Sequence, residues 1–130
     1  QMCIRDSFNS IYAWSYIWGM GASLDERSKE RFDDIIRELF KGAQIPQAGS
    51  VYDYFYDMKK EKAFKPWASK VPAFVYDKEI PYFELLVPTN DSYRHSFCLE
   101  LLLSREKPSF FTGLSGVGKS VIIQNSLTRF

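Results

Sequence analysis

Residues 113–120 constrain the fold more than any other feature, because they fit the pattern G-x-x-x-x-G-K-[ST] at every fixed position. The strand-like segment 108–112, with Phe110 and Phe111 at its centre, precedes the pattern, and apolar residues 121–123 follow it. A strand, a glycine-rich loop and a helix in that order form a phosphate-binding loop, or P-loop. The sequence therefore predicts an α/β fold of the P-loop type. The alternative is a glycine turn before an ordinary helix.

Each residue type in this loop has its own task at a nucleotide. Glycines let successive backbone N–H groups approach phosphate oxygens and adopt positive φ angles. We expect Lys119 to bind the β- and γ-phosphates, and Ser120 to bind the Mg²⁺ that bridges them. The predicted cofactors are therefore ATP or ADP, with Mg²⁺. The residues expected around them are Gly113, Leu114, Ser115, Gly116, Val117, Gly118, Lys119, Ser120 and Val121.

Two helices are predicted in the first third of the chain. Residues 8–20 form an apolar stretch that ends at glycines. Ser23 and Glu26 have the spacing of a capping box, which predicts a second helix from there to about residue 40, ended by Gly42. One face of this second helix is apolar, with Phe32, Ile35, Ile36, Leu39 and Phe40.

The middle of the chain predicts a loop followed by a small hairpin. Residues 43–50 hold Pro, Gly and Ser and are typical of a loop. Residues 51–57 and 71–76 are β-prone, and a charged turn at residues 59–62 lies between them. Pro72 limits the second strand to a sheet edge.

The segment before the P-loop predicts an extended stretch, a helix and a strand. Residues 83–89 are extended, and Thr89 caps a helix that runs to about Ser104. Phe97, Leu101 and the neighbouring leucines are expected to face the core. Residues 108–112 are expected to form a short buried strand.

Composition excludes several classes of partner. The chain has 17 Lys and Arg and 16 Asp and Glu, a net charge of +1, so we expect no binding of nucleic acid or of an anionic membrane. No apolar run reaches the length of a membrane span. Cys3 and Cys98 do not have the spacing of a metal site, and Cys98 is expected to be a reduced thiol. The one histidine, His95, is expected on a helix surface.

Residues 1–7 (QMCIRDS) match the translation of a transposase mosaic end used in sequencing libraries. The match extends through every codon. We therefore predict that residues 1–7 are an adapter artefact, and we exclude them from the fold predictions.

A series of short motifs resembles dynein heavy chains around the junction of their second and third AAA+ modules. The resemblance covers residues 8–130 and ends in the P-loop. Residues 111–120 are most similar to single-headed inner-arm axonemal dyneins. The matching motifs are Trp18-Gly19 with Gly21, Phe32-Asp33, Arg37-Glu38, residues 49–54, Pro66-Trp67, residues 71–74, residues 81–84, residues 86–89 and residues 91–94.

This resemblance implies a division of the chain and a motor function. Residues 8–42 would be the helical C-terminal part of one AAA+ module, residues 43–83 a linker with short strands, and residues 84–130 the truncated start of the next P-loop module. The family's function implies ATP hydrolysis for movement on microtubules in the axoneme of a cilium or flagellum. Microtubules and other dynein subunits would bind parts of the protein outside this sequence. The region near adenine would be Leu86, Val87, Pro88 and Thr89.

Phosphate binding alone does not hydrolyse ATP. Phosphoryl transfer also needs a positioned water and stabilised charge, and we identify no Walker B carboxylate, sensor or arginine finger in the sequence. We therefore expect these 130 residues alone to be inactive. Two alternatives stay open: a regulatory module that binds nucleotide without turnover, and an unrelated P-loop kinase or GTPase. A Walker B carboxylate after the P-loop would favour hydrolysis, and N-K-x-D would indicate a GTPase.

Overall fold

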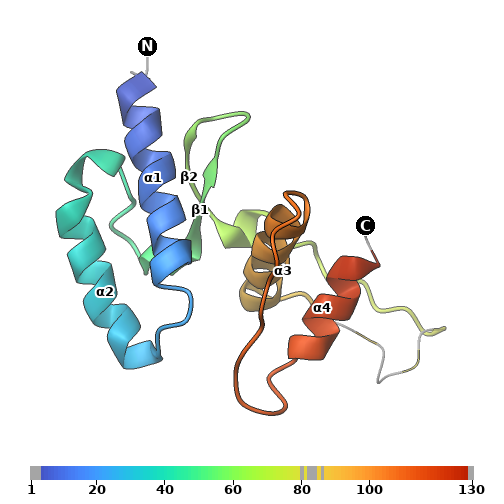
Figure 1. The fold of residues 1–130 in the computed structure, drawn as a ribbon. Coiled ribbons are helices and arrows are strands. Elements are labelled where there is room, and N and C mark those ends of the chain that lie inside the picture. Colours follow the sequence, from blue (N-terminus) through green and yellow to red (C-terminus); the bar gives the residue numbers. More distant parts are fainter. Residues whose placement is uncertain (1–3, 80, 82–84, 86, 129–130) are drawn as a thin grey trace. The chain divides into compact units, whose positions relative to one another are not determined.

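The computed structural model describes residues 4–79, 81, 85 and 87–128. The chain divides into two compact units, residues 1–69 and residues 70–130, shown in Figure 1. Each unit is described by itself below. Within the described ranges, no helix is long and apolar enough to cross a membrane.

Helix α1 (Ile4–Met20) confirms the first predicted helix and begins before residue 8. Ala13 and Ile17, four residues apart, are fully buried on one face. Phe8 and Tyr12 lie on an exposed face, where their rings stack. Aromatic side chains therefore lie on the exposed side of this helix as well as on its buried side. The adapter origin predicted for residues 1–7 stays a prediction.

Helix α2 (Glu26–Leu39) confirms the second predicted helix and its end near residue 40, but the capping box predicted at Ser23 and the stop predicted at Gly42 are wrong. Asp25 is the N-cap and accepts a hydrogen bond from the backbone N–H of Ser28, so the cap lies two positions after Ser23. The hydrogen bonds from Ser28 hold the pKa of Asp25 below its ordinary value. At the other end, Phe40 is the C-cap, and Gly42 lies inside the following 3₁₀ turn, η1 (Lys41–Ala43).

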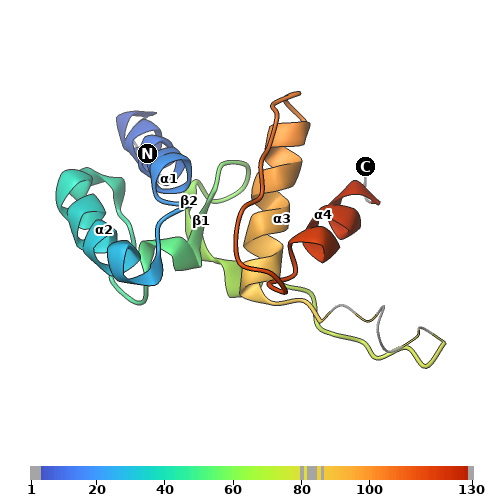
Figure 2. The ribbon, with the colours of Figure 1, turned by 60° about the horizontal axis from the view of Figure 1, so that its bottom comes forward.

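Helices α1 and α2 lie side by side and antiparallel in both ribbon views (Figures 1 and 2). Aromatic rings fill the space between them: Tyr16 stacks on Phe32 at a centroid distance of 6.4 Å and tilts against Phe40 at 5.7 Å. Only part of the predicted apolar face of α2 is buried, because Ile36 lies in the core whereas Ile35 and Leu39 are exposed. The buried cluster of this unit is Ala13, Ile17, Ile36, Ala43, Ile45, Val51 and Tyr52.

A two-stranded antiparallel hairpin follows the 3₁₀ turn η2 (Val51–Asp53). Its strands are β1 (Tyr54–Asp57) and β2 (Ala63–Pro66), and Tyr54 pairs with Pro66. The hairpin and its charged turn are confirmed, but the predicted second strand at 71–76 is wrong. Asp57 explains the shorter hairpin, since its carboxylate accepts from the backbone N–H groups of Lys59 and Lys60 and turns the chain at once.

The hairpin leads into a last 3₁₀ turn, η3 (Trp67–Ser69), which completes the unit. Trp67 is 1% exposed. Its ring meets Trp18 of α1 edge-on at 6.2 Å and Phe55 of β1 at 5.1 Å. Residues 43–69 therefore pack with the two helices in one compact unit, although the sequence placed them in a linker. The module boundaries predicted for the parent protein stay predictions.

Gly21→Ala is expected to destabilise this unit by about 1–3 kcal/mol, as overpacked positions do. A Cβ at Gly21 would collide with the side chains of Tyr52 and Phe32 and would lie 2.7 Å from the carbonyl oxygen of Ile17. Gly19→Ala is the matched control, because a Cβ there meets nothing within 4 Å. Hydrogen exchange of α1 and α2 amides in the intact protein measures the effect. Equal exchange rates in the two variants would contradict this prediction.

The described residues of the second unit form two helices, α3 (Asn90–Leu103) and α4 (Lys119–Leu127). Thr89 caps α3 in a capping box with Ser92, which confirms the predicted start. The predicted core face is confirmed only in part: the neighbouring leucine Leu99 is buried together with Ser96, whereas Leu101 is exposed. Burial also raises the pKa of the Cys98 thiol to about 12, so this thiol is inert at neutral pH.

The strand predicted at residues 108–112 is wrong. The structure gives this segment no strand assignment, and Phe110 is 90% exposed. A parallel strand needs hydrogen-bonding neighbours on a sheet with both faces covered, and β1 and β2 are the only strands in the described part of the chain. The α/β sheet of a P-loop module is therefore not formed by these residues. What they form is a mixed, mostly helical fold with one small sheet.

Candidate phosphate-binding loop

Glycines shape the loop that precedes α4. Gly116 and Gly118 have φ angles of 80° and 81°, in the left-handed region that favours glycine. A Cβ at either position would meet no atom within 4 Å. Packing within the described residues therefore does not explain why these positions are glycine. The left-handed backbone angle does explain it.

Helix α4 begins directly at the loop, with Gly118 as its N-cap. The backbone N–H of Ile122 is bonded to the Gly118 carbonyl, as in a regular first turn. The N–H groups of residues 119–121 precede that bond and point out of the helix start, where an anion is favoured by these donors and by the helix dipole. Both views show the chain returning alongside α3 before α4 begins (Figures 1 and 2).

Lys119 is the first residue of α4, and its side chain folds back over the loop. Its Nζ donates to the carbonyl oxygen of Gly113 at 3.0 Å and also to that of Leu114. The ammonium group therefore lies against the loop backbone and beside the helix start. An ammonium has three N–H donors and one positive charge, so these two contacts place a cation against the loop at the start of α4.

The contacts of the other residues predicted to bind cofactor do not indicate a ligand. Ser120 is exposed at the second position of α4, and no group of three or more His, Cys, Asp or Glu that fits a metal ion occurs among the described residues. Leu86 lies outside the described residues. Val87 is exposed, and the Thr89 hydroxyl is engaged as the cap of α3. The adenine and Mg²⁺ assignments stay predictions.

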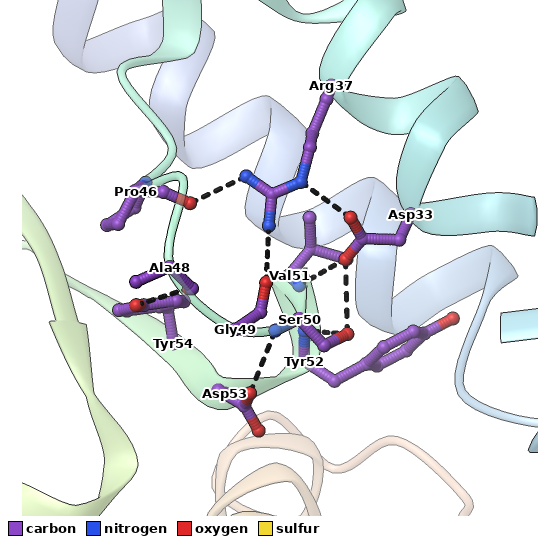
Figure 3. A network of polar contacts seen from close by, with 10 residues as sticks. All are labelled: Asp33, Arg37, Pro46, Ala48, Gly49, Ser50, Val51, Tyr52, Asp53 and Tyr54. Carbon is purple, nitrogen blue, oxygen red and sulfur yellow. Dashed lines mark hydrogen bonds and ion pairs between the residues drawn. The ribbon is translucent and has the colours of Figure 1, made fainter. Parts of the chain in front are cut away.

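One polar cluster was missed by the sequence reading. Asp33 and Arg37 of α2 form an ion pair and bind the backbone of the loop that precedes β1 (Figure 3). The i, i+4 spacing of an acid and an arginine on a helix was visible in the sequence and predicts the ion pair. The bonds to the loop were not visible there, because they depend on the tertiary path of residues 46–51.

Two family models cover most of the chain. Residues 2–69 match the dynein heavy chain AAA lid domain. Residues 74–130 match the P-loop containing dynein motor region. The chain belongs to the dynein heavy chain family. The resemblance predicted from the short motifs is thereby confirmed, and an unrelated P-loop kinase or GTPase is excluded.

Curated relatives agree with this membership in the dynein family. Human dynein axonemal heavy chain 6 is 36% identical over 91% of this chain. The ciliary dynein beta chain of Tripneustes gratilla is 34% identical over 98% of this chain, and the flagellar outer-arm dynein alpha chain of Chlamydomonas reinhardtii is 32% identical over 92%. The chain spans 3% of the length of each of these relatives. The dynein sequences it resembles are thus axonemal, ciliary and flagellar heavy chains.

Proposed function

We propose that residues 113–121 are the Walker A loop of a AAA+ module in a dynein motor and that they bind ATP or ADP with Mg²⁺. The observation that carries the proposal is the position of the Lys119 ammonium. It lies against the carbonyls of Gly113 and Leu114 at the start of α4. Left-handed glycines and an open helix N-terminus complete an arrangement suited to a polyphosphate.

Each group then has a defined role. The loop amides and the N–H groups at the start of α4 hold the phosphate oxygens, and Lys119 neutralises the β- and γ-phosphates. Ser120 supplies a hydroxyl to Mg²⁺. Leu86, Val87, Pro88 and Thr89 are proposed as the side of the site nearest adenine. We assign no hydrolytic group to these residues, so hydrolysis is proposed for the whole module and not for this segment.

The wider assignment follows from the family. Residues 8–42 are proposed to close one AAA+ module, residues 43–83 to lead out of it, and residues 84–130 to begin the next. The parent protein is proposed to be an inner-arm axonemal motor that moves on microtubules in a cilium or flagellum. Its contacts with microtubules and other dynein subunits are proposed to lie outside this segment.

The test is hydrogen exchange of the full-length heavy chain, with and without a non-hydrolysable ATP analogue. We expect slower exchange in peptides that cover residues 113–124, and we expect EDTA to weaken this protection. If exchange in these peptides did not change at saturating nucleotide, the proposal would be wrong.

Ser120→Ala is expected to raise the Mg²⁺ concentration needed for half-maximal protection roughly tenfold, through loss of one oxygen ligand. Ser109→Ala is the control, because Ser109 is exposed and precedes the loop. The Mg²⁺ titration is followed in the same peptides. If the two variants needed the same Mg²⁺ concentration for half-maximal protection, Ser120 would not be a Mg²⁺ ligand.

A further inference from the structure

Residues 46–51 connect α2 to the hairpin, and side chains from one turn of α2 hold them. The Arg37 guanidinium donates through Nη1 to the carbonyl of Pro46 at 2.6 Å and through Nη2 to the carbonyl of Gly49 at 2.9 Å. Its Nε donates to Asp33. All three nitrogens of the guanidinium therefore have acceptors, as Figure 3 shows.

Asp33 binds the same loop as a hydrogen-bond acceptor, whereas Arg37 binds it as a donor. Its Oδ1 accepts from the backbone N–H of Val51 and from the Ser50 hydroxyl, the latter at 3.1 Å. Its Oδ2 accepts from Arg37. The side chains of Asp33 and Arg37 are only 16% and 17% exposed, so solvent screens these charge-assisted bonds less than it would at the surface. We call these two side chains with their loop partners the Asp33–Arg37 clamp.

The held loop passes directly into the hairpin. Ser50 caps η2, and its backbone N–H donates to Asp53 at 2.9 Å. Val51 and Tyr52 are buried in the same cluster as Ile36 of α2. Strand β1 starts at the next residue after η2, and Tyr54 donates its hydroxyl to the carbonyl of Ala48 at 2.6 Å. Polar and apolar contacts thus fix the first residues of the hairpin to α2.

We propose that the Asp33–Arg37 clamp joins α2 and the β1–β2 hairpin into one rigid body that moves and unfolds as a unit. The fork geometry of arginine is needed, because one planar group must reach two carbonyls and a carboxylate at once. The chain leaves this unit at Ser69.

The inference is independent of nucleotide binding and predicts which amides open together. Native-state exchange resolves cooperative units as groups of amides that share one opening reaction. In the full-length heavy chain, peptides from residues 27–40 and from residues 51–66 are expected to share the same denaturant dependence of exchange. Two different dependences in the unmodified protein would overturn the proposal.

Arg37→Met removes the clamp and should separate the two elements. We expect the hairpin peptides to exchange about tenfold faster while the α2 peptides change less than about twofold. Arg31→Met is the matched control, since Arg31 is an exposed arginine on the same helix. If exchange became faster by the same factor in α2 and in the hairpin, Arg37 would only add general stability to the unit. If exchange did not become faster at all, the clamp would not stabilise the hairpin. Either result overturns the proposal.

Arg37→Lys keeps the charge beside Asp33 and tests the geometry if Arg37→Met does not fold. An ammonium group is a point charge that cannot reproduce the fork. The hairpin peptides are therefore expected to exchange several times faster than in the unmodified protein, again without a matching change in α2. Exchange in Arg37→Lys that equals the unmodified protein in both elements would overturn the need for arginine and the proposal with it.

Discussion

Lys119→Ala is expected to weaken nucleotide binding at this module by about 10- to 150-fold, the loss of a charge-assisted contact of about 1.5–3 kcal/mol. The ammonium lies against the loop carbonyls of Gly113 and Leu114, where it would meet the phosphates. Its removal leaves the backbone amides but takes away the positive charge that balances the β- and γ-oxygens.

The measurement has to report on this loop alone, because nucleotide bound elsewhere in the full-length heavy chain would otherwise contribute to the signal. Photolabelling of the full-length heavy chain with an azido-ATP, followed by peptide mapping, reports occupancy beside residues 113–127. Lys107→Ala is the control, since it removes an exposed lysine shortly before the loop. If Lys119→Ala kept the labelling titration of the unmodified protein, the role assigned to this lysine would be wrong.

The parts of the fold that were predicted correctly depend on neighbours in sequence. Helix α3 starts where Thr89 and Ser92 form a capping box, and α4 starts at the lysine of the glycine pattern. Capping and turn signals act within three or four residues, so the sequence displays them directly. The same locality explains the turn at residues 59–62, where a local aspartate closes the hairpin.

The errors come from partners that local signals do not specify. Residues 108–112 have the composition of a buried strand, yet Phe110 is 90% exposed. A strand is defined by its ladder, and the described residues supply no neighbouring strand to this segment. The stripe of α2 fails in part for the same reason, because which apolar side chains are buried depends on what packs against the helix. In this structure Ile36 is covered and Ile35 is not.

The polar contacts of the first unit fall between these two cases. The spacing of Asp33 and Arg37 predicts an ion pair on α2, which the structure contains. The bonds from Arg37 to the carbonyls of Pro46 and Gly49 join residues 9 and 12 positions apart. The path of that loop is set by Val51 and Tyr52 entering the core, which no local pattern indicates. The start of α4 at the glycine-rich loop was therefore easier to predict than the Asp33–Arg37 clamp.

Trp67→Ala is expected to lower the free energy of opening of the first unit by about 3–5 kcal/mol, the range for large aromatic truncations in cores. Trp67 is 1% exposed and packs against Trp18 of α1 and Phe55 of β1. Its indole is thus a direct apolar link between the hairpin end of this unit and its first helix. Truncation leaves a cavity between these two rings, which the surroundings fill only partly.

Two control variants separate packing from general damage. Trp67→Phe keeps a ring in the site and is expected to lose less than Trp67→Ala, because less volume is removed. Tyr76→Ala removes an exposed aromatic outside the unit and is expected to change the exchange rates little, since Tyr76 is 62% exposed.

Hydrogen exchange of α1 peptides in the full-length heavy chain is the measurement that decides. Trp67 lies far from α1 in sequence, so faster exchange in α1 after Trp67→Ala requires that residues 51–69 fold as one unit with α1 and α2. If α1 exchanged at its original rate, residues 51–69 would be a separate element after all, and the packing argument for this unit would fail.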